Sequence, residues 1–142
     1  MTLTREETTN LLARTRLFTG VDAAGLERIA ARVTELDVPA ERVIVRQGEI
    51  GTGFYLVVSG AVRVVRDGET LARLGSGEFF GELSVLDRRP RIAQVVSSEP
   101  TICVALASWD FEAVVQEQPS VAMAILCELA GRLRELTEAQ HH

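Results

Sequence analysis

The sequence contains no lysine, so all fifteen of its basic side chains are arginines. This absence excludes Schiff-base chemistry on lysine and the lysine-dependent phosphate binding of a P-loop. The only two histidines, His141 and His142, end the sequence, and we interpret them as the remnant of a purification tag. Without them, no imidazole remains for a catalytic triad, a zinc site or a haem ligand.

Cysteines and long apolar runs are equally scarce. Two cysteines, Cys103 and Cys127, are too few for an iron–sulfur cluster held by four thiolates, and their apolar surroundings predict buried free thiols. The longest apolar run, 121–127, is far too short to span a bilayer, and residues 1–7 do not resemble a signal peptide. We therefore expect a cytoplasmic protein without membrane contact and without a metal site.

The charge balance argues against direct binding of nucleic acid. Twenty acidic side chains outnumber the fifteen arginines and give a formal net charge of −5. A protein that neutralises a phosphate backbone carries a basic patch instead. A single arginine inside such an acidic chain suits a small anionic ligand better than a polyanion.

The hydrophobic period changes twice along the sequence and predicts one domain over residues 1–140. Helical spacing occupies residues 4–33 and returns over 108–138. Between them, over 33–107, short apolar runs alternate with glycine, proline and aspartate. The predicted strands are 33–38, 43–46, 54–58, 61–66, 70–74, 92–97 and 102–105. This pattern predicts a mainly β fold, a jelly-roll-like β-roll that is flanked by N-terminal helices and a long C-terminal helix.

Local signals predict where the helices begin. Thr4 and Asp22 are the expected caps of the first two helices, and Ser108 is the expected cap of the third. Pro119 suits the first turn of the last helix, because that position needs no backbone N–H.

The last helix has two apolar stripes. One stripe, Val121 and Ile125, is expected to face the roll. The other is a seam whose members alternate four and three residues apart, which is typical of a coiled coil. The seam consists of Ala122, Leu126, Leu129, Leu133 and Leu136. It predicts a homodimer through this helix.

The stretch 79–96 combines features that suit a small anionic ligand. Gly81 permits a phosphate to approach the backbone closely. A helical turn, predicted to follow it with Glu82 in its first turn, presents unpaired N–H groups and a positive dipole end. Arg91, after Pro90, can donate two parallel hydrogen bonds to phosphate oxygens. Because a carboxylate repels an anion, Glu82 makes sense only as an acceptor for neutral donors such as a ribose hydroxyl.

In these residues the stretch resembles the phosphate-binding cassette of cyclic nucleotide-binding domains, the module of catabolite activator proteins, protein kinase A regulatory subunits and gated channels. The family pattern F-G-E-L-A-L-L, a short loop and P-R-A-A-x-V stands here as residues 80–86 and 90–95 without a gap. A looser resemblance covers residues 17–137. The ligand-binding positions that it implies are Gly81, Glu82, Leu83, Ser84, Arg91, Ile92 and Ala93.

The resemblance also implies roles for residues outside the cassette. Val64, Ala72 and Leu74 match positions that line the pocket in relatives, and a simple core role is an equally good interpretation of them. Leu136 and Thr137 match the positions that reach the base in catabolite activators. For these two, a seam residue and a surface threonine are the alternatives.

Ile92 departs from the family pattern. Relatives carry Ala, Ser or Thr directly after the arginine, where a hydroxyl helps to recognise guanine. Ile92 therefore argues against a preference for cyclic GMP, and it adds apolar bulk beside the mouth of the pocket.

The resemblance implies a non-catalytic regulatory module that binds a cyclic nucleotide, with cyclic AMP as the leading ligand. Binding is expected to move the last helix and so to signal to an effector that the sequence does not identify. Two alternatives stay open. One is the sensing half of a catabolite-activator-type regulator without its DNA-binding domain, and the other is a degenerate domain that binds no nucleotide and acts as a scaffold. No nucleophile–base pair or metal cluster supports an enzyme.

Overall fold

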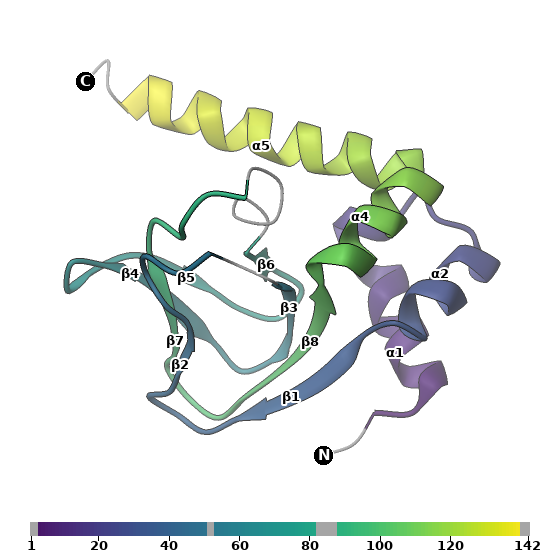
Figure 1. Cartoon of the computed structure of the whole chain (residues 1–142), viewed down its shortest axis with the longest axis horizontal. Coiled ribbons are helices and arrows are strands. Elements are labelled where there is room, and N and C mark those ends of the chain that lie inside the picture. Colours follow the sequence, from purple (N-terminus) through teal and green to yellow (C-terminus); the bar gives the residue numbers. More distant parts are fainter. Residues whose placement is uncertain (1–2, 51–52, 82–87, 140–142) are drawn as a thin grey trace.

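The structure, a computed structural model, describes residues 3–50, 53–81 and 88–139. Its strands are β1 (Thr34–Val38), β2 (Val43–Val45), β3 (Gly53–Ser59), β4 (Val62–Arg66), β5 (Glu69–Leu74), β6 (Phe79–Phe80), β7 (Gln94–Ser97) and β8 (Thr101–Ala107). They form two four-stranded antiparallel sheets, one in the order β1-β8-β3-β6 and one in the order β2-β7-β4-β5. Figure 1 shows the two sheets curled into a roll. The mainly β roll that the sequence predicts is thus confirmed.

The helices are α1 (Arg5–Arg14), the short 3-10 helix η1 (Arg16–Phe18), α2 (Ala23–Ala30), α4 (Ser108–Glu117) and α5 (Pro119–Ala139). As predicted, Thr4 caps α1 in a capping box with Glu7, and Asp22 accepts a backbone hydrogen bond at the start of α2. The prediction for Ser108 is wrong. The cap of α4 is Ala107, which makes no side-chain hydrogen bond, and Ser108 is already helical.

The strand pattern missed β6 and placed the start of β7 two residues too early. β6 has only two residues, which is too short for an alternating pattern to be recognised, and it is defined by its pairing with β3. β7 begins at Gln94 because the chain just before it is bonded elsewhere. There the N–H of Arg91 donates to the carbonyl of Glu49, and the carbonyl of Arg91 accepts from the N–H of Gly48, each at 2.8 Å.

β3 and β8, in the middle of the sheet β1-β8-β3-β6, are largely buried, and their alternating side chains reach both faces of the sheet. Phe54 and Leu56 of β3 belong to a core that they share with the helices, and Phe54 stacks on Phe111 of α4 with ring centroids 5.0 Å apart. The core inside the roll consists of Val45, Val57, Val62, Phe80, Val95 and Cys103. The side chains of β3 therefore pack against the helices on one face and against the interior of the roll on the other.

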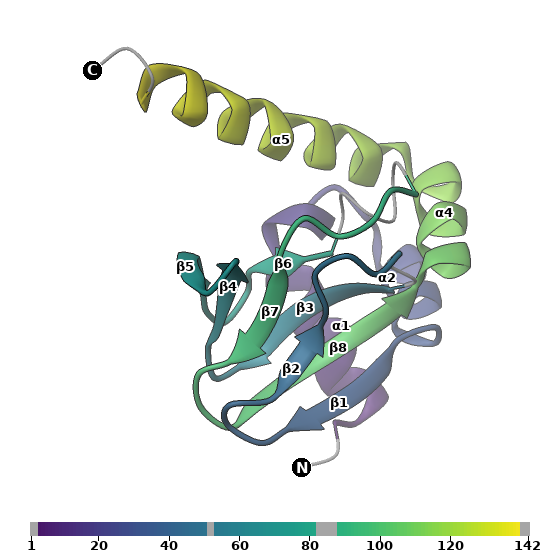
Figure 2. The ribbon, with the colours of Figure 1, turned by 60° about the vertical axis from the view of Figure 1, so that its left-hand side comes forward.

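α5 runs across one end of the roll (Figures 1 and 2), and its first half carries the contacts. Val121 and Ile125 are buried in the core that the helices share with strands of the roll, where α5 packs on α4 and η1. That this stripe faces the roll itself stays a prediction. Leu129 also packs partly against the helix-side core, so it does not belong to a free seam. The other leucines of the seam are more than half exposed: Leu126 (59%), Leu133 (65%) and Leu136 (64%). Within the described part of the chain, no helix combines the length and the apolar character that crossing a membrane requires.

The two cysteines lie in different environments. Cys103 on β8 is fully buried, and burial raises the pKa of its thiol to about 11. Cys127 on α5 is exposed, so the prediction of two buried thiols is wrong for this residue. The apolar run around it is one side of a helix whose buried stripe is Val121 and Ile125, and Cys127 falls outside that stripe.

We expect one thiol per native chain, that of Cys127, to react with an aromatic disulfide reagent at about pH 8, and two thiols in denaturant. The raised pKa of Cys103 leaves little reactive thiolate at that pH, and its burial excludes the reagent. The release of the coloured thiol measures both counts. The variant Cys127→Ser should give no reaction when native and one thiol when unfolded. Two reactive thiols in the native protein would contradict the burial of Cys103.

Candidate functional site

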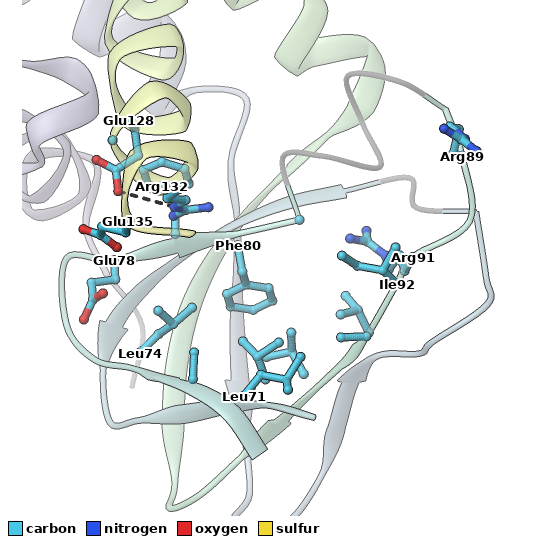
Figure 3. Close-up of a pocket in the computed structure, with 18 of the residues that line it drawn as sticks. Leu71, Leu74, Glu78, Phe80, Arg89, Arg91, Ile92, Glu128, Arg132 and Glu135 are labelled. Atoms are coloured by element: carbon cyan, nitrogen blue, oxygen red, sulfur yellow. Dashed lines mark ion pairs between the residues drawn. The ribbon is translucent and has the colours of Figure 1, made fainter. Parts of the chain in front are cut away.

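A cavity of about 970 Å³ opens between the roll and α5 (Figure 3). Its apolar wall comes from the roll and consists of Val45, Val64, Leu71, Ala72, Leu74, Phe80 and Val95. The structure therefore brings together Val64, Ala72 and Leu74, the three positions for which the resemblance implies a pocket wall. Ala72 is exposed, so a core role alone does not describe it. Contact of these side chains with a ligand stays a prediction.

Arg91 is held at one end of this cavity by its side chain as well as by its backbone. Its Nη2 donates a hydrogen bond of 2.9 Å to the carbonyl of Gly53, the first residue of β3. Only 9% of the residue is exposed. Its backbone bonds to the 48–49 turn hold the other end of the side chain in place. The result is a fixed positive charge in the wall of the cavity, which can bind an anion with little further loss of side-chain entropy.

Gly81 lies where the chain leaves β6 and passes close to Arg91. Its φ is +94°, which side chains rarely adopt, and a Cβ there would lie 2.7 Å from the Gly53 carbonyl oxygen and 3.1 Å from Nη1 of Arg91. Any larger residue would therefore disturb the bond between Arg91 and Gly53. Approach of a phosphate to this backbone stays a prediction.

The remaining cassette positions divide into two groups. Ile92 and Ala93 line the cavity next to Arg91; Ala93 is buried, whereas Ile92 is 63% exposed and adds apolar surface at this position, as the sequence predicts. Predicted ligand positions outside the described residues are Glu82, Leu83 and Ser84, and the helical turn predicted there is outside them too.

α5 supplies a second wall, made by residues that the sequence pattern did not single out as binding residues. They are Cys127, Glu128, Gly131, Arg132 and Glu135. The two predicted base-contact residues, Leu136 and Thr137, do not line the cavity. The hydroxyl of Thr137 instead donates to the carbonyl of Leu133 at 2.9 Å. The sequence contained one usable signal, the i,i+4 spacing of Glu128 and Arg132, but it did not show that this pair faces the roll.

The α5 wall is fixed to the roll and to η1 by a small charged network. Glu128 pairs with Arg132 at 3.5 Å and with Arg16 of η1 at 3.6 Å. The guanidinium of Arg132 lies 5.2 Å from the centre of the Phe79 ring, within the range of a cation–π contact. These contacts are partly or largely exposed, so each contributes little to stability, but they link α5 to η1 and to Phe79 of β6 beside the cavity.

The cavity has two chemically different ends (Figure 3). Arg89 and Arg91 line one end, next to Ile92. Three carboxylates and two arginines line the other end, namely Glu78, Glu128, Glu135, Arg16 and Arg132. Apolar side chains, among them Leu74 and Phe80, separate the two ends. Such a cavity suits a ligand with an anionic end, an apolar middle and hydrogen-bond donors at its far end.

Comparison with known proteins identifies relatives of this fold and site. The cyclic AMP receptor protein of Thermus thermophilus is 43% identical over 102 residues, which are 68% of this chain and 47% of the receptor. A CRP-like cAMP-activated global transcriptional regulator of Mycobacterium tuberculosis is 28% identical over 129 residues, 87% of this chain and 58% of the regulator. The crystal structure of the Thermus thermophilus catabolite activator protein superimposes with a TM-score of 0.82 at 36% identity, covering 89% of this chain and 62% of that one.

The chain spans about half the length of the curated relatives it matches. The family model of the cyclic nucleotide-binding domain matches residues 35–118, which include the strands of the roll, Gly81 and Arg91. Because this match covers more than half of the 142 residues, the chain belongs to the cyclic nucleotide-binding domain family.

Proposed function

We propose that this chain is a non-catalytic, cytoplasmic regulatory module that binds cyclic AMP in the cavity beneath α5. The observation that carries the proposal is the buried Arg91 guanidinium at the end of a largely apolar cavity. In this proposal Arg91 and the N–H of Ile92 bind the cyclic phosphate, together with the N–H of Ser84. Gly81 and Glu82 bind the ribose. Pocket-wall contacts to the base come from Val64, Ala72 and Leu74, with Leu83 and Ala93 completing the cassette.

The geometry of Arg91 supports a phosphate rather than a neutral ligand. A guanidinium carries five N–H donors in one plane, and the bond from Nη2 to the Gly53 carbonyl fixes that plane. Phosphate oxygens accept parallel hydrogen bonds from such a planar group. Because the residue is 91% shielded from water, charge-assisted bonds made there are stronger than on an exposed surface.

One contact supports a coupling between ligand binding and α5, whereas the predicted base contacts, Leu136 and Thr137, do not line the cavity where α5 lies here. An ion pair of 2.5 Å between Arg88 and Glu112 joins the segment before Arg91 to α4, which leads directly into α5. A ligand shifts α5 only if it binds one position of the helix more tightly than another, and a direct contact between ligand and helix would provide that difference.

Sensing within a longer transcription regulator is a second candidate, which the Mycobacterium tuberculosis relative favours. That relative is a transcriptional regulator by name, and this chain covers 58% of it. The net charge of −5 argues against DNA contact by these residues themselves. Both candidates leave DNA contact to residues outside this chain, so sequence-specific DNA binding by this chain alone in a gel-shift experiment would contradict both.

The first test is the variant Arg91→Ala. We expect its affinity for cyclic AMP, measured by isothermal titration calorimetry, to fall about one hundredfold, because two charge-assisted hydrogen bonds are lost. Arg91→Lys keeps the charge but loses the planar pair of donors, and we expect an intermediate loss.

A matched control is Arg66→Ala, which removes an equal charge from an exposed position that does not line the cavity. It should bind cyclic AMP like the unchanged chain. Wild-type affinity in Arg91→Ala would refute the site. No binding by the unchanged chain would leave only the scaffold interpretation.

We also propose a homodimer through the exposed leucines of α5. Leu126, Leu133 and Leu136 lie on one helix, each more than half exposed, and no described segment covers them. Apolar side chains at this spacing become buried when two such helices pack against each other. Leu129, which packs partly against the core, contributes at most its remaining surface.

The dimer is tested with Leu133→Glu. We expect the unchanged chain to sediment as a dimer at micromolar concentration in analytical ultracentrifugation, and the variant to sediment as a monomer, because a carboxylate in the seam loses its hydration. Ile50→Glu is the control, since Ile50 is 63% exposed on the roll and lies away from α5 in the sequence. A monomeric unchanged chain, or an equal effect of both variants, would contradict the proposed interface.

A further inference from the structure

A second cavity, of about 640 Å³, lies between the end of α1, η1, residues 76–78 before β6, and α5. The two cavities adjoin, because six residues line both of them: Arg16, Glu78, Phe79, Cys127, Glu128 and Arg132. Arg14, the last residue of α1, lines only the second cavity. Contact with Arg14 therefore distinguishes a ligand of the second cavity from a ligand of the first.

The two carboxylates that line the second cavity already have partners. Glu128 pairs with Arg132 at 3.5 Å and with Arg16 at 3.6 Å. Glu78 accepts a hydrogen bond of 3.1 Å from the backbone N–H of Gly75. Among the described residues that line this cavity, three arginines against two carboxylates leave one positive charge in excess.

The arginines of this cavity also carry more hydrogen-bond donors than these partners occupy, since each guanidinium has five N–H groups. Within the described part of the chain, the guanidinium of Arg14 makes neither a hydrogen bond nor an ion pair. The 3.6 Å contact of Arg16 is longer than a hydrogen bond, and its side chain is 91% exposed. The hydroxyls of Thr15 and Thr19 donate to backbone carbonyls. The donors that a ligand meets here are therefore those of the arginines.

We propose that the second cavity binds a multiply charged oxyanion of the phosphate type. Its volume suits a small molecule. Guanidinium groups bind phosphate oxygens through parallel, charge-assisted hydrogen bonds. Arg14 belongs to α1, Arg16 to η1 and Arg132 to α5, so an anion with several oxygens can accept hydrogen bonds from more than one helix.

Such an anion would join the N-terminal helices to α5. The ion pair that links them at this cavity, between Arg16 and Glu128, is largely exposed on its arginine side and contributes little to stability. An anion that binds only the folded chain stabilises it by mass action. The proposed cyclic AMP site is not required for this binding, since Arg91 does not line the second cavity.

The test titrates inorganic pyrophosphate into the chain in a calorimeter at constant ionic strength, so that screening by salt stays the same. We expect Arg14→Ala to bind pyrophosphate about tenfold more weakly than the unchanged chain, because charge-assisted hydrogen bonds are lost. Alanine is the best helix former, so α1 tolerates it at this exposed position. Arg28→Ala is the matched control, because it removes an equal charge from an exposed residue of α2 that lines neither cavity. It should bind pyrophosphate like the unchanged chain.

Three outcomes would overturn the inference. The first is that the unchanged chain binds no pyrophosphate at millimolar concentration. The second is an equal loss in Arg14→Ala and Arg28→Ala, which would indicate a general effect of charge. The third is unchanged binding in Arg14→Ala together with a loss in Arg91→Ala, which would place the anion in the first cavity. None of them bears on the affinity for cyclic AMP, which the variants of Arg91 test separately.

Discussion

The hydrogen bond from Arg91 to the carbonyl of Gly53 is the contact on which the site depends. Removing a guanidinium from water costs free energy unless its donors find partners, and a backbone carbonyl at the start of β3 is such a partner. Gly81 is needed for the same reason, because a Cβ there would meet both that carbonyl and the guanidinium. The start of β3, the end of β6 and the residue Arg91 thus meet at one point, which requires that the roll be closed.

The two ends of the cavity are built on supports of different stiffness. At the arginine end, Arg91 is bonded to the first residue of β3, a strand whose side chains are buried on both faces. Its backbone also makes two hydrogen bonds of 2.8 Å to the 48–49 turn. The α5 end rests on a helix of which the first half is buried and the second half is exposed, held over the cavity by partly exposed ion pairs. Local opening is least costly where few apolar contacts and exposed ion pairs hold an element. A ligand that joins both ends therefore adds most order at α5.

Local patterns predicted most of the fold, since caps, alternation and turns depend on neighbouring residues. Thr4 and Asp22 cap the helices as expected, whereas Ser108 is helical because the end of β8 determines where α4 begins. The wall formed by α5 was not predictable in the same way. Spacing along a helix shows which residues share a face, but the burial of Val121 and Ile125 in the helix-side core sets which face is left to meet the cavity. Counting along the helix therefore indicated Thr137, while the structure brings Glu135 to the cavity.

The distribution of charge explains how a protein with a net charge of −5 can accept an anion at this site. Its overall field repels anions at long range, and salt screens that field within about 8 Å at physiological ionic strength. Inside the cavity the near charges dominate: Arg89 and Arg91 line one end, and three carboxylates with Arg16 and Arg132 line the other. A nucleotide that entered in the reverse direction would bring its phosphate to the end where carboxylates outnumber arginines and would leave Arg91 facing a neutral base. Repulsion at one end and attraction at the other therefore favour one orientation of the ligand.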